Sequence, residues 1–109
     1  MGHFNIQPSS GQFYFVLRAS GNNEALLVSE RYTTKSACKT GIESVKTNAK
    51  IDSRYQRLTA SNGQFYFNLK AGNGEIIGTS ELYQTEASRD AGIKLVNDQA
   101  PDAPVNDLT

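Results

Sequence analysis

Apolar and polar residues alternate through two separate stretches of this chain. In the first stretch Phe13, Phe15 and Leu17 fall on one face, and the residues between them are more polar. Phe65, Phe67 and Leu69 repeat this arrangement in the second stretch. Because alternation with a period of two places successive side chains on opposite faces, each stretch predicts a β-strand with one face toward a core.

Each alternating stretch is followed by a turn signal and a second apolar run. Gly and Asn, which tolerate positive φ, make up most of the segments 20–23 and 72–74. The runs that follow, 24–28 and 75–79, read as return strands, so each half of the chain predicts a β-hairpin. The second turn is one residue shorter than the first, as hairpin tips tolerate.

A helix is predicted after each hairpin. Thr34 and Thr85 stand at matching positions and suit an N-cap, where a side-chain oxygen accepts a backbone N–H. The small and apolar residues that follow at helical spacing are Ala37, Cys38, Gly41, Ile42, Val45 and Ala49 in the first half, and Ala87, Ala91, Gly92, Ile93, Leu95, Val96 and Ala100 in the second. The second helix is expected to end before Pro101, because a residue that precedes proline avoids helical geometry.

The two halves are therefore copies of one pattern. The segment 11–19 returns as 63–71, 29–32 returns as 80–83, and 41–45 returns as 92–96. With further strands at 4–6 and 54–58, the order β-β-β-α occurs twice. We expect repeats at 1–53 and 54–109 that share one core, because a unit of about 50 residues is near the lower limit for independent folding. The predicted class is α+β, one mainly antiparallel sheet with two helices on one face.

The paired Gly-x-Phe-x-Phe-x-Leu-[Arg/Lys]-Ala strands, the Ser-Glu-x-Tyr segments and the Gly-Ile-x-x-Val helices resemble the YegP-like family of small bacterial proteins. The resemblance runs from Phe4 to about Val96. It implies a pseudo-symmetric fold of two β3-α-β units that exchange their final strands. From its polar composition, and from Pro101 before it and Pro104 within it, the tail 103–109 reads as a last edge strand or a frayed end. The family is functionally uncharacterised, so the resemblance implies no catalytic residues.

Composition narrows the function classes. Eleven basic and eleven acidic residues balance, which disfavours strong general attraction to nucleic acid or an anionic membrane. One Cys and one His cannot form a disulfide or a structural zinc site, so we expect no metal and no cofactor. Cys38, on the apolar helix face, reads as a buried small side chain, and His3 has no predicted partner. With no signal peptide and no membrane-length apolar run, a cytoplasmic location is expected.

The Gly-Gln-Phe-Tyr-Phe stretch has superficial similarity to an RNA-binding strand whose aromatic side chains stack on bases. The order of elements and the zero net charge argue against that function, so Phe13 and Phe15 are assigned to the core. The opposite face of the sheet is the candidate binding surface, because Tyr and Arg are enriched at binding sites. Its residues are Tyr14, Arg18, Tyr66, Asn68 and Lys70.

A second group lies at the corner between each hairpin and its helix. Its members are Ser29, Glu30, Tyr32, Ser80, Glu81 and Tyr83, for which a structural role is predicted. A carboxylate near a helix N-terminus is favoured by the helix dipole without any ligand. An alternative is that Glu30 and Glu81 pair across the symmetry axis for acid–base catalysis.

Three functions therefore stay open. The leading hypothesis is a non-enzymatic module that binds a protein or a small molecule on the outer sheet face. The others are an enzyme with a cleft between the repeats at Glu30 and Glu81, and a weak binder of single-stranded nucleic acid. A monomer or a weak homodimer, paired through an open sheet edge, is expected.

Overall fold

The computed structural model describes residues 2–109 and contains two helices and seven strands. In chain order the elements are β1 (His3–Ser9), β2 (Gln12–Arg18), β3 (Ala25–Val28), α1 (Lys35–Asn48), a 3-10 turn (Asp52–Arg54), β4 (Tyr55–Thr59), β5 (Phe65–Lys70), β6 (Ile76–Thr79), α2 (Glu86–Gln99) and β7 (Val105–Asp107). The predicted order β-β-β-α occurs in both halves.

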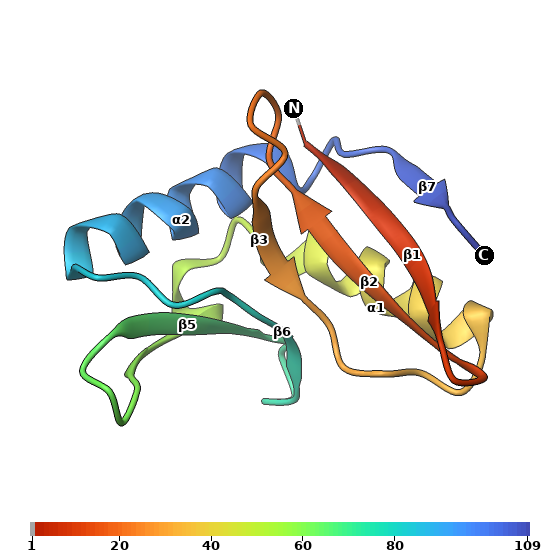
Figure 1. Cartoon of the computed structure of the whole chain (residues 1–109), viewed down its shortest axis with the longest axis horizontal. Helices are drawn as coiled ribbons and strands as arrows, with labels where there is room; N and C mark the ends of the chain where they lie inside the picture. The colour runs from red at the N-terminus through yellow and green to blue at the C-terminus, as the bar shows by residue number, and fades with distance from the viewer. Residues whose placement is uncertain (1) are drawn as a thin grey trace.

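All strands form one sheet in the order β4-β5-β6-β3-β2-β1-β7. Every neighbouring pair is antiparallel except β1 and β7, which run parallel. Both helices pack on one face of the sheet, α1 against β2 and α2 against β5, and the other face is open (Figure 1). The predicted α+β architecture is confirmed.

Local sequence signals account for the helix ends. The side-chain oxygens of Thr34 and Thr85 each accept a hydrogen bond of 3.0 Å from the backbone N–H three residues later. The donors are Ala37 and Ser88. Each cap satisfies one of the free N–H groups of a first helical turn. The second helix ends at Gln99, as Pro101 predicts.

The core lies between the sheet and the helices and draws on both halves. Phe15 and Leu17 of β2, and Phe67 and Leu69 of β5, are completely buried in one cluster. Cys38 is buried in the same cluster. Phe15 and Phe67 therefore serve packing, as the sequence predicts, and their buried rings are not available to stack on bases. Phe13, also expected in the core, is only partly buried and packs against the cluster.

Two helical glycines allow the close approach of a tyrosine from each corner. A Cβ atom added at Gly41 would collide with the hydroxyl of Tyr32, and one added at Gly92 would collide with that of Tyr83. Any larger residue would have to displace the ring. This packing outweighs the weak helix propensity of glycine, which costs roughly 1 kcal/mol relative to alanine.

The buried face of α2 differs from the expected one. Ala87, Ala91 and Leu95 lie on the exposed side, whereas Arg89 is 6% exposed. The guanidinium of Arg89 lies 5.7 Å from the centre of the Phe65 ring and 3.2 Å from Asp90. An aromatic partner and a carboxylate make burial of this arginine tolerable.

The C-terminal tail is an ordered strand. After α2 the chain returns to the first half, where β7 pairs with β1 in the register Phe4↔Val105 and Ile6↔Asp107. Correspondingly, β4 follows α1 but pairs with β5 of the second half. Lys35 Nζ forms an ion pair of 3.0 Å with Asp107. Hydrogen bonds from Thr109 and Lys35 lower the pKa of the Asp107 carboxyl. The strand exchange implied by the resemblance is confirmed.

The halves meet at β3 and β6, and this joint is short. A single residue pair, Val28↔Thr79, joins the two strands. On the helix side, Leu27 packs on Gly78 so closely that a Cβ there would lie 2.5 Å from Leu27 Cγ. The boundary expected at 53/54 stays a prediction.

Candidate functional site

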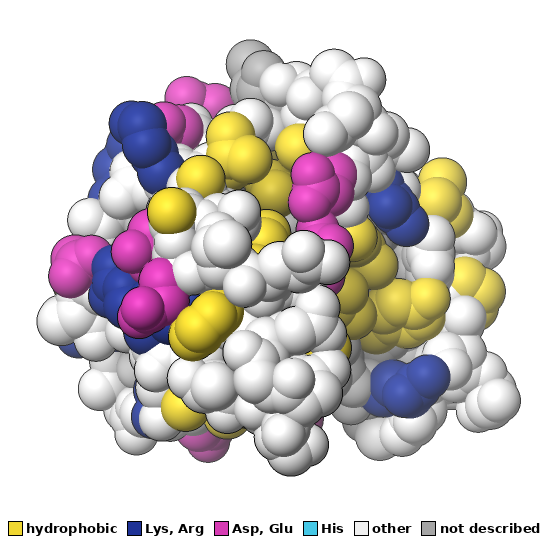
Figure 2. Space-filling model, turned by 60° about the vertical axis from the view of Figure 1, so that its left-hand side comes forward, with side chains coloured by type: hydrophobic (Ala, Val, Ile, Leu, Met, Phe, Trp, Pro, Cys, Tyr) yellow, Lys and Arg dark blue, Asp and Glu magenta, His cyan; other side chains and the backbone are white. Residues whose placement is uncertain are grey.

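A cleft of about 860 Å³ opens over the joint between β3 and β6. Its walls come from β3 and the corner after it, and from β6 with the turn before it and the corner after it. The lining residues are Ala25, Val28, Ser29, Glu30, Gly74, Glu75, Ile76, Gly78, Thr79, Ser80 and Glu81. Figure 2 shows the molecule from this side, with a hollow that has hydrophobic side chains on its wall and an acidic group at its border.

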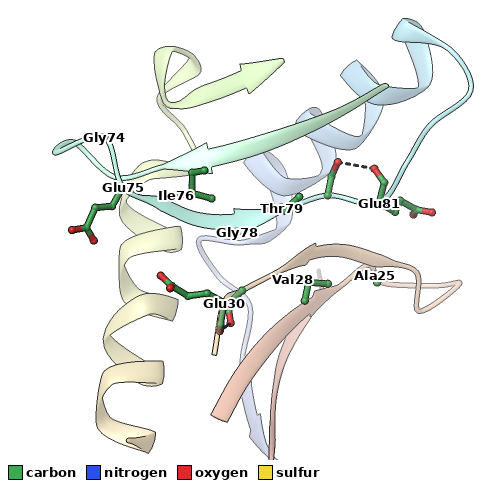
Figure 3. Close-up of a pocket in the computed structure, with 11 residues that line it drawn as sticks. Ala25, Val28, Glu30, Gly74, Glu75, Ile76, Gly78, Thr79 and Glu81 are labelled. Carbon is green, nitrogen blue, oxygen red and sulfur yellow. Dashed lines mark hydrogen bonds between the residues drawn. The ribbon is translucent and has the colours of Figure 1, made fainter. Parts of the chain in front are cut away.

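Carboxylates occupy both ends of the cleft. Glu30 and Glu75 lie toward one end and Glu81 lies toward the other (Figure 3). The predicted candidates Glu30 and Glu81 therefore line one cleft from opposite ends, rather than meeting across the symmetry axis. The partner of Glu81 is Glu24, which the sequence reasoning missed.

Contact with Glu24 changes the pKa of Glu81 strongly. A hydrogen bond with the Glu24 carboxyl, together with burial and the Glu24 charge, raises the pKa of Glu81 to about 7. Two adjacent carboxylates cannot both ionise without repulsion, so a proton is retained between them. The repeat could have pointed to Glu24, because Glu24 and Glu75 occupy equivalent positions before the two return strands.

The same acidic pairs act on the corner tyrosines. Burial is the largest cause that raises the pKa of Tyr83, to about 12, and the charges of Glu81 and Glu24 add to it. Burial likewise raises the pKa of Tyr32, with contributions that include the charges of Glu30 and Glu75. Each corner tyrosine thus lies within electrostatic reach of one glutamate from each half.

A row of cross-strand neighbours runs across the outer face of the sheet, through the cleft. Val16, Val28, Thr79 and Asn68 are successive neighbours on β2, β3, β6 and β5. Asn68 is 7% exposed, accepts a hydrogen bond of 2.8 Å from Thr79 Oγ1 and donates one of 3.2 Å to Gln56 Oε1. Its amide is therefore engaged within the sheet, although it was expected among the binding residues.

The other expected binding residues flank the cleft. Tyr14 on β2 and Tyr66 on β5 are separated by β3 and β6, so three strand spacings, about 14 Å, lie between their strands. The Tyr14 hydroxyl donates to Gln7 at 2.6 Å. Arg18 donates to Asn23 O at 3.2 Å, and Lys70 lies opposite Ile76. A binding role for these residues stays a prediction.

The corner serines and tyrosines close the two hairpins. Ser29 Oγ accepts from Phe15 N–H at 2.9 Å and donates to Glu30 O at 2.7 Å. Ser80 repeats both bonds with Phe67 and Glu81. Backbone hydrogen bonds also join Tyr32 to Phe13 and Tyr83 to Phe65. These contacts hold each corner in place beside the cleft.

Within residues 2–109, no group of three or more His, Cys, Asp or Glu side chains is arranged to hold a metal ion. Burial raises the pKa of Cys38, which disfavours its reactive thiolate. In the same part of the chain, no helix has the length and apolar character needed to cross a membrane.

Comparison with known proteins accounts for the repeat. The family model described as a domain of unknown function, DUF1508, matches residues 9–56 and again residues 60–107. A UPF0339 protein of Bordetella pertussis is 51% identical over 108 residues, which cover 99% of this chain and 96% of that protein. UPF0339 protein YegP of Escherichia coli is 49% identical over 109 residues, covering 99% and 98%.

Two solved structures have the same fold. The solution NMR structure of a UPF0339 protein from Shewanella oneidensis superposes with a TM-score of 0.92 at 50% identity, covering 99% of this chain and 92% of that one. The NMR structure of yegP from E. coli, described as a protein of unknown function, gives 0.93 at 49% identity, covering 99% and 93%. Nothing in these descriptions indicates enzymatic activity. Because both repeats match the family model and the relatives align over nearly their whole length, this chain belongs to the UPF0339 family of YegP-like bacterial proteins.

Proposed function

We propose that the protein is a non-enzymatic interaction module that binds a partner protein on the outer face of its sheet, with the β3–β6 cleft at the centre of the contact. The observation that carries this proposal is the cleft itself, an open depression of about 860 Å³ lined by both repeats. Surface depressions with apolar walls are the usual location of recognition sites.

Two exposed aliphatic side chains favour a protein partner. Val28 is 39% exposed and Ile76 is 45% exposed, and both line the cleft. Tyr14 and Tyr66 lie on the strands beyond the cleft, where they would border a bound partner. Apolar centres with aromatic neighbours are typical of protein contact surfaces.

The test is affinity capture from native cytosol with the wild type and two matched variants. Val28→Arg places a charge in the cleft, and Leu95→Arg places the same charge on α2 at a side chain of similar exposure, 37%, outside the cleft. We expect Val28→Arg to lose the captured partner and Leu95→Arg to retain it. Retention by both variants, or equal loss from both, would exclude the cleft.

The Tyr14→Ala, Tyr66→Ala double variant extends the test to the flanks of the cleft. If these tyrosines border the partner, capture falls while the fold is kept, because neither ring is in the buried core cluster.

The cytoplasmic location expected from the sequence also stays a prediction, which cell fractionation would test.

A further inference from the structure

The acidic residues of the protein fall into two groups. Ion pairs engage Glu43, Asp52, Glu86, Asp90, Asp98 and Asp107. Among residues 2–109, Glu24, Glu30, Glu75, Glu81 and Asp102 have no such partner. All of these unpaired acids except Asp102 gather at the β3–β6 cleft, so uncompensated negative charge is concentrated there.

The charge is arranged with the pseudo-symmetry of the repeats. Glu24 and Glu81 approach each other at one end of the cleft. Their repeat equivalents are Glu75 and Glu30, which lie at the other end (Figure 3). Arg18 and Lys70 lie on the neighbouring strands, but no ion pair in the described chain joins either of them to these glutamates.

The middle of the cleft is apolar. Val28 and Ile76 are exposed there, between the two acidic ends. The only residue pair between β3 and β6, Val28↔Thr79, also lines this part of the cleft.

We propose that the β3–β6 cleft binds an extended peptide segment of a partner protein that carries a Lys or Arg at each end of a short apolar stretch. The proposal rests on the proposed function and specifies the chemistry of the partner. Charge complementarity with the two glutamate pairs selects the basic ends, and Val28 with Ile76 selects the apolar centre. From Glu24 to Glu30 an extended chain spans at most about 20 Å, so the basic residues should be about six positions apart.

The test uses the full chain and a capped heptapeptide, Lys-Ser-Val-Thr-Val-Ser-Lys, in which both Lys and both Val point to one side. A second peptide has Glu in place of both Lys. Amide NMR spectra recorded during titration at low salt should show saturable shifts at Val28, Ser29, Ile76 and Ser80 for the Lys peptide alone. The spectra also report directly whether each protein variant is folded.

Matched variants test the glutamates. At pH 8, where Glu81 with its pKa of about 7 is mostly ionised, Glu81→Gln and Glu75→Gln should each weaken binding of the Lys peptide by about 2- to 5-fold, the usual size of an exposed charge pair. Asp102→Asn removes an equally unpaired carboxylate away from the cleft and should leave binding unchanged. Val28→Arg should abolish binding.

The proposal is overturned if the Lys and Glu peptides bind alike, if the glutamate variants bind as tightly as the wild type, or if the shifts map outside the cleft. These outcomes are separable from the proposed function. If Val28→Arg abolishes partner capture but the cleft does not prefer the Lys peptide, the interaction site exists and its partner has a different chemistry. Failure of both experiments would remove both proposals.

Discussion

At the scale of single residues, two tyrosines that pack against the helices differ in the contacts of their hydroxyl groups. Tyr55 is buried and Tyr83 is partly buried, and burial raises the pKa of each. The Tyr55 hydroxyl donates to Ala49 O at 2.6 Å, at the end of α1. The Tyr83 hydroxyl is buried against α2 with no hydrogen-bond partner among the described residues. Two apparently similar tyrosines should therefore respond differently to loss of the hydroxyl.

We predict that Tyr55→Phe lowers the free energy of unfolding by about 1–2 kcal/mol, because it removes a buried hydrogen bond and leaves a carbonyl without a partner. Tyr83→Phe removes an oxygen that has no partner, so it should be neutral within about 0.5 kcal/mol or slightly stabilising. Urea unfolding of both variants beside the wild type provides the measurement. Equal losses would contradict the assignment of Tyr83.

Burial of single residues was predicted from the sequence where the alternation of apolar and polar residues allowed only one interpretation. The core positions Phe15, Leu17, Phe67 and Leu69 followed from period two, and all are buried. Burial of Arg89 was not predicted, although it stands at the repeat position of the buried Cys38, because a charged side chain there depends on the Phe65 ring, which comes from a distant strand. Glu24 escaped because a residue beside a turn has no periodic neighbours that would show its contacts.

At the scale of elements, the joint between β3 and β6 is the feature on which the candidate site depends. The two strands have four residues each and share only the pair Val28↔Thr79. At one end of this joint, Glu24 of the first half meets Glu81 of the second. Repulsion between these carboxylates acts across the joint and should make its stability depend on pH.

We predict that ionisation of Glu81 destabilises the protein. Its pKa is about 7 in the folded chain, against 4.5 for an ordinary glutamate, so the folded state holds the proton more tightly. The resulting contribution to stability is complete below about pH 4.5 and is lost as the pH rises through 7. Glu81→Gln cannot ionise, so its stability relative to the wild type should increase from pH 5 to pH 8.

Urea unfolding at several pH values measures this difference. Glu24→Gln should remove the same pH dependence, and the double variant should show no further change, because the two groups act as a pair. A difference between Glu81→Gln and the wild type that is constant from pH 5 to pH 8 would refute the prediction.

At the scale of the whole molecule, the repeats are interdependent. One cluster of buried residues includes Phe15 and Phe67 from the two halves, and β7 from the end of the chain pairs with β1 at its beginning. Helix α1 packs on β6 as well as β2, and α2 packs on β3 as well as β5. Neither repeat alone can bury its own apolar face.

We therefore predict that fragments 1–53 and 54–109, prepared separately, show no cooperative thermal unfolding by circular dichroism, whereas the intact chain unfolds in a single transition. Each fragment is near the size at which a lone core fails, and each loses the helix of the other that packs on its sheet. Fragment 1–53 also loses β7, which pairs with β1. A cooperative transition in either fragment would show that the repeats are independent domains.

The sequence by itself determined the repeat, the strands and helices, their caps and the buried residues Phe15, Leu17, Phe67 and Leu69, because each of these depends on neighbours within a few positions. The strand exchange followed from family resemblance, and composition left the tail undecided. Only the tertiary structure decided that β3 and β6 meet at one residue pair, and that Glu81 faces Glu24 while Glu30 lies at the opposite end of the cleft. These contacts join residues far apart in the chain, and their geometry depends on how two twisted half-sheets meet, which no local pattern encodes.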